Sequence, residues 1–398
     1  MKYDFDKYVN RRNSASVKWD GIGDVFGVIN NDIIPLWIAD MDFLSPPEVI
    51  EAIKRRAEHG VFGYSLKPDS FYTAIVDWMR KRHDWKIKKE WMLVTPGVVA
   101  GLSMAVLSYT EPGDEVIVQP PVYSPFFNVV KNNERRVVYN PLKLENGRYT
   151  MDFEDLEGKF TSRTKMLILC SPHNPTGRVW SEDELKKLGE ICLEHNTLIV
   201  SDEIHSDLVY KGVKHTPIAS ISDEFAQNTV TFIAPSKTFN VAGLSTSIAI
   251  IPNLKLLESF NEVVEKMEAG YTNIFGIVAA EAAYKYGEEW LEEVLAYLRG
   301  NLGFLKDFLK EKLPEIKVIE PEGTYLVWLD FRKLEMDDRS LNDFLLKEAK
   351  VALVSGSAFG PGGEGFQRMN IATPRSVLKK ALERMERAIK KMKIGGKS

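Results

Sequence analysis

Six short apolar segments, rich in β-branched residues, recur through the middle of the chain. They lie at residues 91–94, 115–119, 166–170, 197–201, 229–234 and 247–251. Apolar residues occupy successive positions in these segments, which is typical of strands buried on both faces of a sheet. Helical patterns separate several of them, as crossovers between parallel strands require. The pattern therefore predicts an α/β fold with a mostly parallel central sheet covered by helices.

The clearest crossover helix begins after Ser181. Ser181 and Glu184 form the capping-box pattern, in which each side chain bonds the other residue's backbone N–H. Leu185, Leu188 and Cys192 follow at helical spacing and form an apolar stripe. We therefore predict a helix here that packs on the sheet, with Cys192 in the core.

The two ends of the chain predict a second, smaller α/β layer. The pattern is helical over residues 252–313, strand-like at residues 324–330 and helical again over about residues 377–392. Residues 1–45 are irregular and precede Pro46-Pro47, a predicted helix start. The predicted parts are an N-terminal segment that joins the small domain (1–45), a large domain that contains the central sheet (46–285) and a C-terminal small domain (286–398).

Composition narrows the class of protein. The 398 residues are 44% hydrophobic and 27% charged, which indicates a globular chain. With 52 Lys and Arg against 56 Asp and Glu, the net charge of −4 makes nucleic acid and membrane surfaces poor partners. Two cysteines are too few for a disulfide framework, and neither a signal-peptide pattern nor a long apolar run is present. We therefore expect a cytoplasmic protein.

The first candidate catalytic residue is Lys237. It lies directly after a predicted strand, in the segment Ala234-Pro235-Ser236-Lys237-Thr238-Phe239-Asn240. Sites in α/β sheets lie at the carboxyl ends of the strands. A lysine at the edge of a buried sheet can have a lowered pKa and act as a Schiff-base nucleophile. A lone Ser-Lys-Thr is more often a solvated loop, so this interpretation depends on the neighbouring motifs.

Two other predicted strands end in residues that suit the same chemistry. Asp202 ends one of them, and His205 lies three residues further on. If Lys237 holds pyridoxal 5′-phosphate (PLP), an ionised carboxylate at Asp202 keeps the pyridine nitrogen protonated and makes the ring an electron sink. Asn174, which precedes a proline, can donate to the phenolic oxygen of the ring. Taken alone, Asp202 also fits a helix cap and Asn174 an ordinary turn.

Three further motifs are candidates for binding a phosphate, a flat heterocyclic ring and a carboxylate. Thr95-Pro96-Gly97-Val98-Val99 lies between a predicted strand and an apolar helix, so its free backbone N–H groups can face an anion. Tyr123 follows another strand and can stack on a heterocycle. Arg368 or Arg375 can bind an amino-acid carboxylate in bidentate fashion. The pattern alone does not choose between the two arginines.

The order and spacing of these motifs resemble the fold-type I PLP enzymes of the aminotransferase class I/II superfamily. The chain is most similar to the MalY/PatB-type cystathionine β-lyases, including the cystalysin-like C–S lyases, essentially from end to end. The segments that carry the resemblance are 36–43, 171–175, 201–205 and 234–240. It implies PLP as the cofactor, an amino acid as the small-molecule substrate, and a homodimer with shared active sites.

The resemblance also implies roles for individual residues. Lys237 would bond covalently to PLP, Asp202 would pair with the pyridine nitrogen, and Tyr123 would stack on the ring. Asn174 would meet the ring oxygen and the substrate, and Arg368 would bind the substrate carboxylate. The other implied cofactor contacts are Ser236 and the amides of Val98 and Val99 at the phosphate, His205, and Tyr64 from the partner subunit.

Two positions differ from related enzymes. His205 stands where aminotransferases usually carry a tyrosine, and a histidine there is a feature of the lyase subgroup. Ser124 stands where cystalysin-like members carry a second tyrosine, which leaves open the group that protonates the leaving thiolate. We therefore predict a PLP-dependent β-lyase (a cystathionine β-lyase) that cleaves L-cystathionine or a related S-substituted cysteine to a thiol, pyruvate and ammonia. The alternatives are a class I/II aminotransferase and, less favoured, a PLP-binding regulatory protein.

Two other motif readings are set aside. Asp202-Glu203-Ile204-His205 also spells a DExH box, but no P-loop with a following helix accompanies it. The six histidines form no His-Glu-x-x-His motif and none pairs with a cysteine at zinc spacing, so we expect no metal site.

Overall fold

A seven-stranded sheet forms the centre of the computed structural model, which describes residues 2–28 and 30–395. Strand β10 runs antiparallel to its neighbours β2 and β9, and the other pairings are parallel. In spatial order the strands are β2 (Met92–Thr95), β10 (Ser247–Ile250), β9 (Thr229–Ile233), β8 (Leu198–Asp202), β7 (Thr164–Cys170), β3 (Glu115–Val118) and β4 (Arg136–Tyr139). The predicted, mostly parallel sheet is confirmed, with strand ends within about two residues of those expected. The sequence pattern missed β4, an edge strand that is only partly buried.

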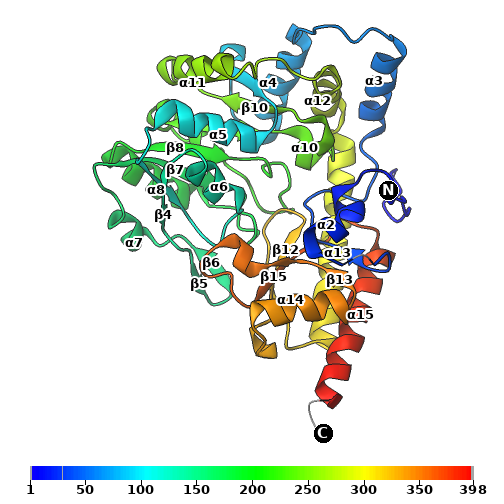
Figure 1. Ribbon diagram of the computed structural model, residues 1–398. Helices are drawn as coiled ribbons and strands as arrows, with labels where there is room; N and C mark the ends of the chain where they lie inside the picture. The colour runs from blue at the N-terminus through cyan, green and yellow to red at the C-terminus, as the bar shows by residue number, and fades with distance from the viewer. Residues whose placement is uncertain (1, 29, 396–398) are drawn as a thin grey trace.

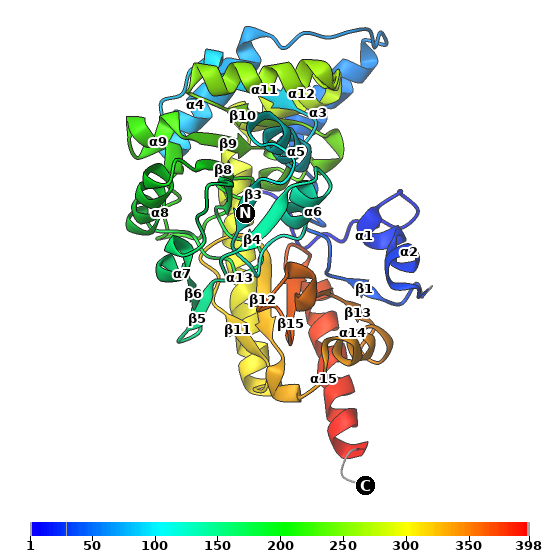
Figure 2. The same ribbon diagram turned by 60° about the vertical axis from the view of Figure 1, so that its left-hand side comes forward.

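Both faces of this sheet are covered, as its continuous apolar strands require. In β3, Val116 and Val118 pack into one core cluster, whereas Ile117 between them packs into another. Figures 1 and 2 show the helices on the two sides of the sheet. One cluster contains residues of α5 (Val98–Tyr109), α6 (Pro125–Lys131) and α11 (Leu254–Lys266), and the other contains residues of α7 (Phe153–Glu157), α8 (Glu182–Glu194) and α9 (Asp223–Gln227).

Helix α8 begins as its sequence predicts. The Glu184 N–H donates to Ser181 Oγ at 3.2 Å, and the Ser181 N–H donates to Glu184 Oε2 at 2.8 Å. Cys192, on the buried face of this helix, is fully buried in the core, as expected. The capping box therefore fixes the N-terminus of α8, the helix that connects the parallel strands β7 and β8.

The largest core cluster joins the sheet to the lower part of the molecule. It contains residues of α3 (Pro47–Glu58), α4 (Asp69–His83), α12 (Ile274–Tyr286) and α13 (Glu288–Lys312). The long helix α13 runs from the upper to the lower part of the molecule (Figure 1). Within residues 2–28 and 30–395, every helix falls short of the length and apolar character needed to cross a bilayer.

A second, four-stranded antiparallel sheet lies in the lower part. Its order is β11 (Lys317–Ile319), β12 (Leu326–Asp330), β15 (Phe366–Asn370) and β14 (Val354–Ser355), with α14 (Asp338–Lys347) and α15 (Arg375–Gly395) beside it. Strand β1 (Ile34–Pro35) pairs in parallel with β13 (Val351–Ala352), so the N-terminal segment lies beside the C-terminal part of the chain. The predicted domain boundaries stay a prediction.

Candidate active site

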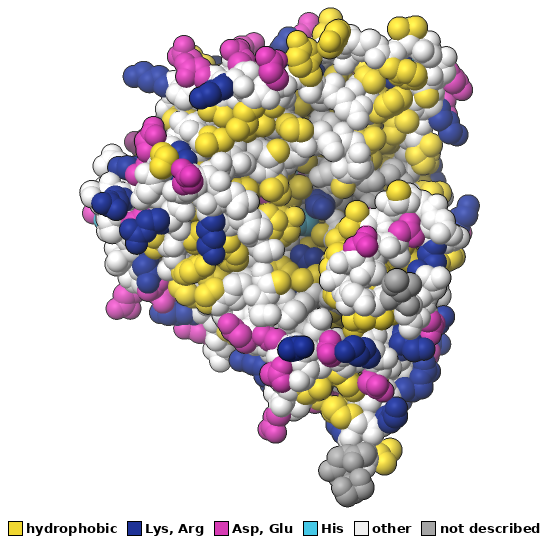
Figure 3. Space-filling model, viewed as in Figure 1, with side chains coloured by type: hydrophobic (Ala, Val, Ile, Leu, Met, Phe, Trp, Pro, Cys, Tyr) yellow, Lys and Arg dark blue, Asp and Glu magenta, His cyan; other side chains and the backbone are white. Residues whose placement is uncertain are grey.

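Most of the predicted site residues surround one cavity of about 220 Å³ at the carboxyl ends of the parallel strands. A hollow with basic and histidine side-chain atoms at its bottom opens in the middle of one face of the molecule (Figure 3). Adjacent strands β7, β8 and β9 end at the same edge, so residues far apart in sequence meet there. The predicted residues that line the cavity are Val98, Val99, Tyr123, Asn174, Asp202, His205, Ser236 and Lys237.

Lys237 lies in the short helix α10 (Pro235–Thr238), directly after β9. Its Nζ donates a hydrogen bond of 2.7 Å to the carbonyl oxygen of Ala39. Burial, helped by the positive charge of Arg368 and opposed by the negative charge of Asp40, lowers the pKa of Lys237 to about 8. An amine with this pKa has a larger neutral fraction near neutral pH than an ordinary lysine, as Schiff-base chemistry requires.

Asp202 ends β8 with its side chain 3% exposed. Its Oδ1 accepts a hydrogen bond of 3.1 Å from the Ile204 N–H, and the described residues place no cation in an ion pair with it. Burial raises the pKa of Asp202 to about 7, because the loss of water outweighs the hydrogen bond from Ile204 and the charge of Lys237, which both favour the carboxylate. A buried carboxylate in this state fits a ligand that brings its own positive charge, such as a protonated pyridine nitrogen.

Tyr123 and Asn174 lie side by side at the cavity, since the Tyr123 N–H donates to the Asn174 carbonyl oxygen at 3.1 Å. The Asn174 N–H points to Cys170 Sγ at 3.4 Å, and Asn174 Oδ1 accepts from Arg368 Nη1 at 3.0 Å. Because Oδ1 is engaged by the arginine, the Nδ2 donors of Asn174 are left for a ligand oxygen. This arrangement suits the phenolic oxygen of a PLP ring stacked on Tyr123.

Arg368 lies in β15 of the smaller sheet and contacts Asn174, which lines the cavity. Its Nη2 donates to the Trp37 carbonyl oxygen at 2.8 Å, while its Nε is buried without a hydrogen-bond partner among the described residues. Burial lowers the pKa of Arg368 to about 10, so the guanidinium still carries its charge at neutral pH. Arg375 instead begins α15 and donates to Asn301 Oδ1 at 3.0 Å. Of the two candidate arginines for the substrate carboxylate, Arg368 is the one that contacts Asn174 at the cavity.

The start of α5 forms a cradle that fits a phosphate. Gly97 has φ of 129°, a conformation that L side chains rarely adopt, and nothing lies within 4 Å of where its Cβ would be. The N–H groups of Val98 and Val99 begin the 12-residue helix, and both residues line the cavity together with Ser236. Free N–H donors and the positive end of a helix dipole favour an anion at this place.

His205 forms part of the cavity wall, where it is 3% exposed. Its Nδ1 has no hydrogen-bond partner among the described residues. Burial lowers the pKa of His205 to about 3, and the nearby charges of Lys237 and Arg368 act in the same direction. The imidazole is therefore neutral and serves as a surface against which a ring can pack.

Tyr64 stands apart from the other predicted residues. It lies in the loop between α3 and α4, is 97% exposed, and has its ring 5.6 Å from that of Tyr271. It does not line the cavity of its own chain. Its expected contact, from one subunit to the cofactor of the other, stays a prediction.

The sequence analysis missed the backbone that faces Lys237. The Ala39 carbonyl oxygen accepts from Lys237 and, at 3.0 Å, from the hydroxyl of the fully buried Tyr325. Asp40 next to it is held by Arg11, whose Nη2 lies 2.7 Å from Asp40 Oδ2. The resemblance already singled out residues 36–43, but no residue pattern indicated that their carbonyl groups would line the site.

The family of the chain agrees with this fold and site. The family model for aminotransferases of class I and II matches residues 31–385. The chain belongs to this family, and the predicted fold class is confirmed.

Individual relatives narrow the resemblance. Cystathionine β-lyase PatB of Bacillus subtilis is 47% identical over 97% of this chain and 99% of its own length. Protein MalY of Escherichia coli is 34% identical over 98% and 99% of the two chains. The crystal structure of cystalysin from Treponema denticola, which contains a pyridoxal 5′-phosphate cofactor, matches with a TM-score of 0.96 at 40% identity, over 98% of this chain and 100% of that one. The resemblance to MalY/PatB-type and cystalysin-like lyases is confirmed.

Proposed function

We propose that this protein is a PLP-dependent cystathionine β-lyase. It cleaves the C–S bond of L-cystathionine, or of a related S-substituted cysteine, by α,β-elimination to a thiol, pyruvate and ammonia. The observation that carries the proposal is that one cavity is lined by both the Lys237 amine and the Asp202 carboxylate, which forms no ion pair within the described part of the chain. The relative PatB is named for this activity and matches over nearly the whole chain.

Bound PLP stabilises the electron pair that remains on the substrate when its α-proton is removed. The residues of the cavity fit this group at each end. Asp202 would pair with the pyridine nitrogen, the start of α5 with Ser236 would hold the phosphate, and Tyr123 would pack on the ring. His205 remains neutral and adds packing without adding charge.

Lys237 is the general base in this proposal. Its lowered pKa of about 8 leaves a useful fraction of neutral amine near neutral pH, which is the condition for efficient proton transfer. The Ala39 carbonyl oxygen, 2.7 Å from Nζ, orients the amine. Removal of the α-proton lets the bond to sulfur break at the adjacent carbon, and the thiolate leaves.

Arg368 and Asn174 orient the substrate. The Arg368 guanidinium is fixed by the Trp37 carbonyl and by Asn174, so its positive charge lies beside the cavity, where it would attract a carboxylate. Holding the α-carboxylate fixes which face of the substrate Lys237 meets. Arg368 thus binds and positions the amino acid without taking part in proton transfer.

The test is incubation of PLP-loaded protein with L-cystathionine and no keto acid, while pyruvate, ammonia and cofactor absorbance are followed together. We expect sustained, equimolar pyruvate and ammonia with the absorbance retained. Lys237→Ala should abolish turnover, whereas the exposed control Lys255→Ala should keep it. One turnover that bleaches the absorbance and resumes only on addition of a keto acid would identify an aminotransferase instead. PLP binding without turnover of any amino acid would favour a regulatory protein.

The proposal includes a homodimer in which each subunit completes the site of the other. Exposed apolar side chains gather beside Tyr64: Phe62 is 58% and Tyr271 70% exposed, and both line the same surface hollow. A patch of this kind is typical of an interface. Hybrid dimers of Lys237→Ala and Tyr64→Ala chains would then contain one intact site. Activity in the mixture that exceeds the sum of the two pure variants would support shared sites, and simple additivity would refute them.

We place the enzyme in the cytoplasm. Cys170 and Cys192 are both buried free thiols, which suits a reducing compartment.

A further inference from the structure

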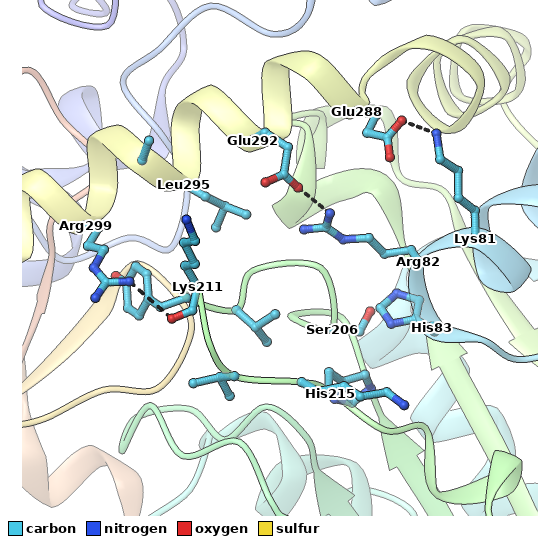
Figure 4. Close-up of a pocket in the computed structure, with 15 residues that line it drawn as sticks. Lys81, Arg82, His83, Ser206, Lys211, His215, Glu288, Glu292, Leu295 and Arg299 are labelled. Atoms are coloured by element: carbon cyan, nitrogen blue, oxygen red, sulfur yellow. Dashed lines mark hydrogen bonds and ion pairs between the residues drawn. The ribbon is translucent and has the colours of Figure 1, made fainter.

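A second, larger cavity lies away from the candidate active site. Its volume is about 780 Å³, within the range of small-molecule sites, and its lining shares no residue with the active-site cavity. Its walls are the end of α4, the loop of residues 206–215 after β8, and the first half of α13. Figure 4 shows side chains from these three elements converging on one space.

The residues that line this cavity carry more positive than negative charge. Lys81 and Arg82 at the end of α4 are paired with Glu288 and Glu292 of α13. The three further basic residues of the lining form no ion pair within the described part of the chain; they are Lys211, Lys214 and Arg299. Figure 4 shows the Lys211 side chain extending from its loop towards α13. The cavity therefore offers uncompensated positive charge to a ligand.

The floor of the cavity carries a buried polar atom without a partner. His215 is 3% exposed, and its Nε2 lies 2.8 Å from Glu203 Oε2. The other ring nitrogen, Nδ1, has no hydrogen-bond partner among the described residues. His83 lies beside it with ring centroids 5.5 Å apart, and its own Nε2 is engaged by Asp207 at 2.8 Å. Glu203 and Asp207 therefore hold both imidazole rings in place at the floor of the cavity.

We propose that this cavity is a second binding site, for a small polyanion. Three basic side chains that line one cavity and form no ion pair within the described part of the chain suit a ligand with at least two negative charges. A phosphorylated metabolite and a polycarboxylate share this chemistry. An amino-acid substrate of the lyase, with one carboxylate and one ammonium group, does not match it.

The test is titration calorimetry on the PLP-loaded protein at low ionic strength, so that the cofactor already fills the phosphate cradle of the active site. Pyrophosphate represents phosphorylated ligands, citrate represents polycarboxylates, and acetate is the single-charge control. We expect pyrophosphate or citrate to bind with a dissociation constant below about 1 mM and acetate not to bind detectably. The polyanion that binds identifies the class of ligand.

A matched pair of variants locates the bound anion. Lys211→Gln with Lys214→Gln removes two exposed rim charges that make no ion pair, so the fold should be unaffected. Lys255→Gln with Lys310→Gln removes the same charge from exposed positions elsewhere. We expect the rim variant to weaken binding at least about fivefold and the control to change it less than about twofold. Failure of both polyanions to bind wild-type protein, or equal loss in the two variants, would overturn the proposal. Lyase activity is not needed for this measurement, so the proposed function can fail independently.

Discussion

Replacement of Asp202 by asparagine should stabilise the cofactor-free protein while it impairs the enzyme. The carboxylate is 3% exposed, accepts one backbone hydrogen bond from Ile204, and has no ion-pair partner among the described residues. Asparagine has nearly the same shape, and its Oδ1 can accept the same bond. The substitution therefore removes a buried charge and little else.

The size of the effect follows from the pKa. Burial raises the pKa of Asp202 to about 7, against 3.8 for an exposed aspartate. Between these two values the folded chain keeps a proton that the unfolded chain has lost, so folding stability falls as the pH rises through this window. At about 1.4 kcal/mol for each tenfold change in acid equilibrium, the full cost is about 4 kcal/mol and is reached above pH 7. Asp202→Asn should therefore raise the free energy of unfolding by up to about 4 kcal/mol at pH 8 and by almost nothing at pH 4.

The assay is urea unfolding of the cofactor-free protein at pH 4.5, 6 and 8, at one fixed protein concentration. The control Asp183→Asn removes the same charge from an exposed position on α8 and should stay within about 0.5 kcal/mol of wild type. With PLP bound, Asp202→Asn should lower turnover about 100-fold or more, the scale of losing one preorganised electrostatic group. A variant that is less stable than wild type at pH 8 without PLP would refute the reasoning.

Three further predictions concern other parts of the site. Arg368→Lys should raise KM for L-cystathionine at least about tenfold in steady-state kinetics, since an ammonium group cannot reproduce the bidentate fork. Because burial lowers the pKa of Lys237 to about 8, the rate of PLP incorporation into cofactor-free protein, followed by absorbance, should rise with pH about a midpoint near 8; a midpoint near 10.5 would contradict this. Gly276→Ala should lower stability by about 1–3 kcal/mol in urea unfolding, because the new Cβ would lie 2.0 Å from Oγ1 of Thr246 in the cavity wall.

The part of the site that sequence could predict lies at the ends of parallel strands. Asn174, Asp202 and Lys237 each follow a continuous apolar run, and such runs indicate neighbouring strands of a covered sheet. Because β7, β8 and β9 are adjacent and parallel, their carboxyl ends meet at one edge. Local pattern and the topology of α/β sheets together were sufficient to bring these three residues into one cavity.

Contacts that depend on distant chain segments could not be predicted in this way. Arg368 and Arg375 are seven positions apart, and the residues around them in the sequence do not distinguish them. The pairing of β15 with β12 and β14 is what buries Arg368 beside Asn174. The Ala39 carbonyl meets Lys237 across 198 positions of sequence, through an irregular segment that has no periodicity to read. Tyr64 is exposed in the isolated chain, so its predicted role needs a second subunit.

The unpaired groups around the cavity connect the stability of this protein to its chemistry. The Asp202 carboxylate, His205 Nδ1 and Arg368 Nε are all buried without the partners that such groups normally have within the described part of the chain. Each therefore lowers the stability of the empty fold relative to an apolar side chain of the same size. In the proposed function, a protonated pyridine nitrogen would supply the cation that Asp202 lacks, and a substrate carboxylate would supply the anion that Arg368 lacks. Because a ligand that binds only the folded chain adds its binding free energy to stability, the cost carried by Asp202 returns as affinity for PLP.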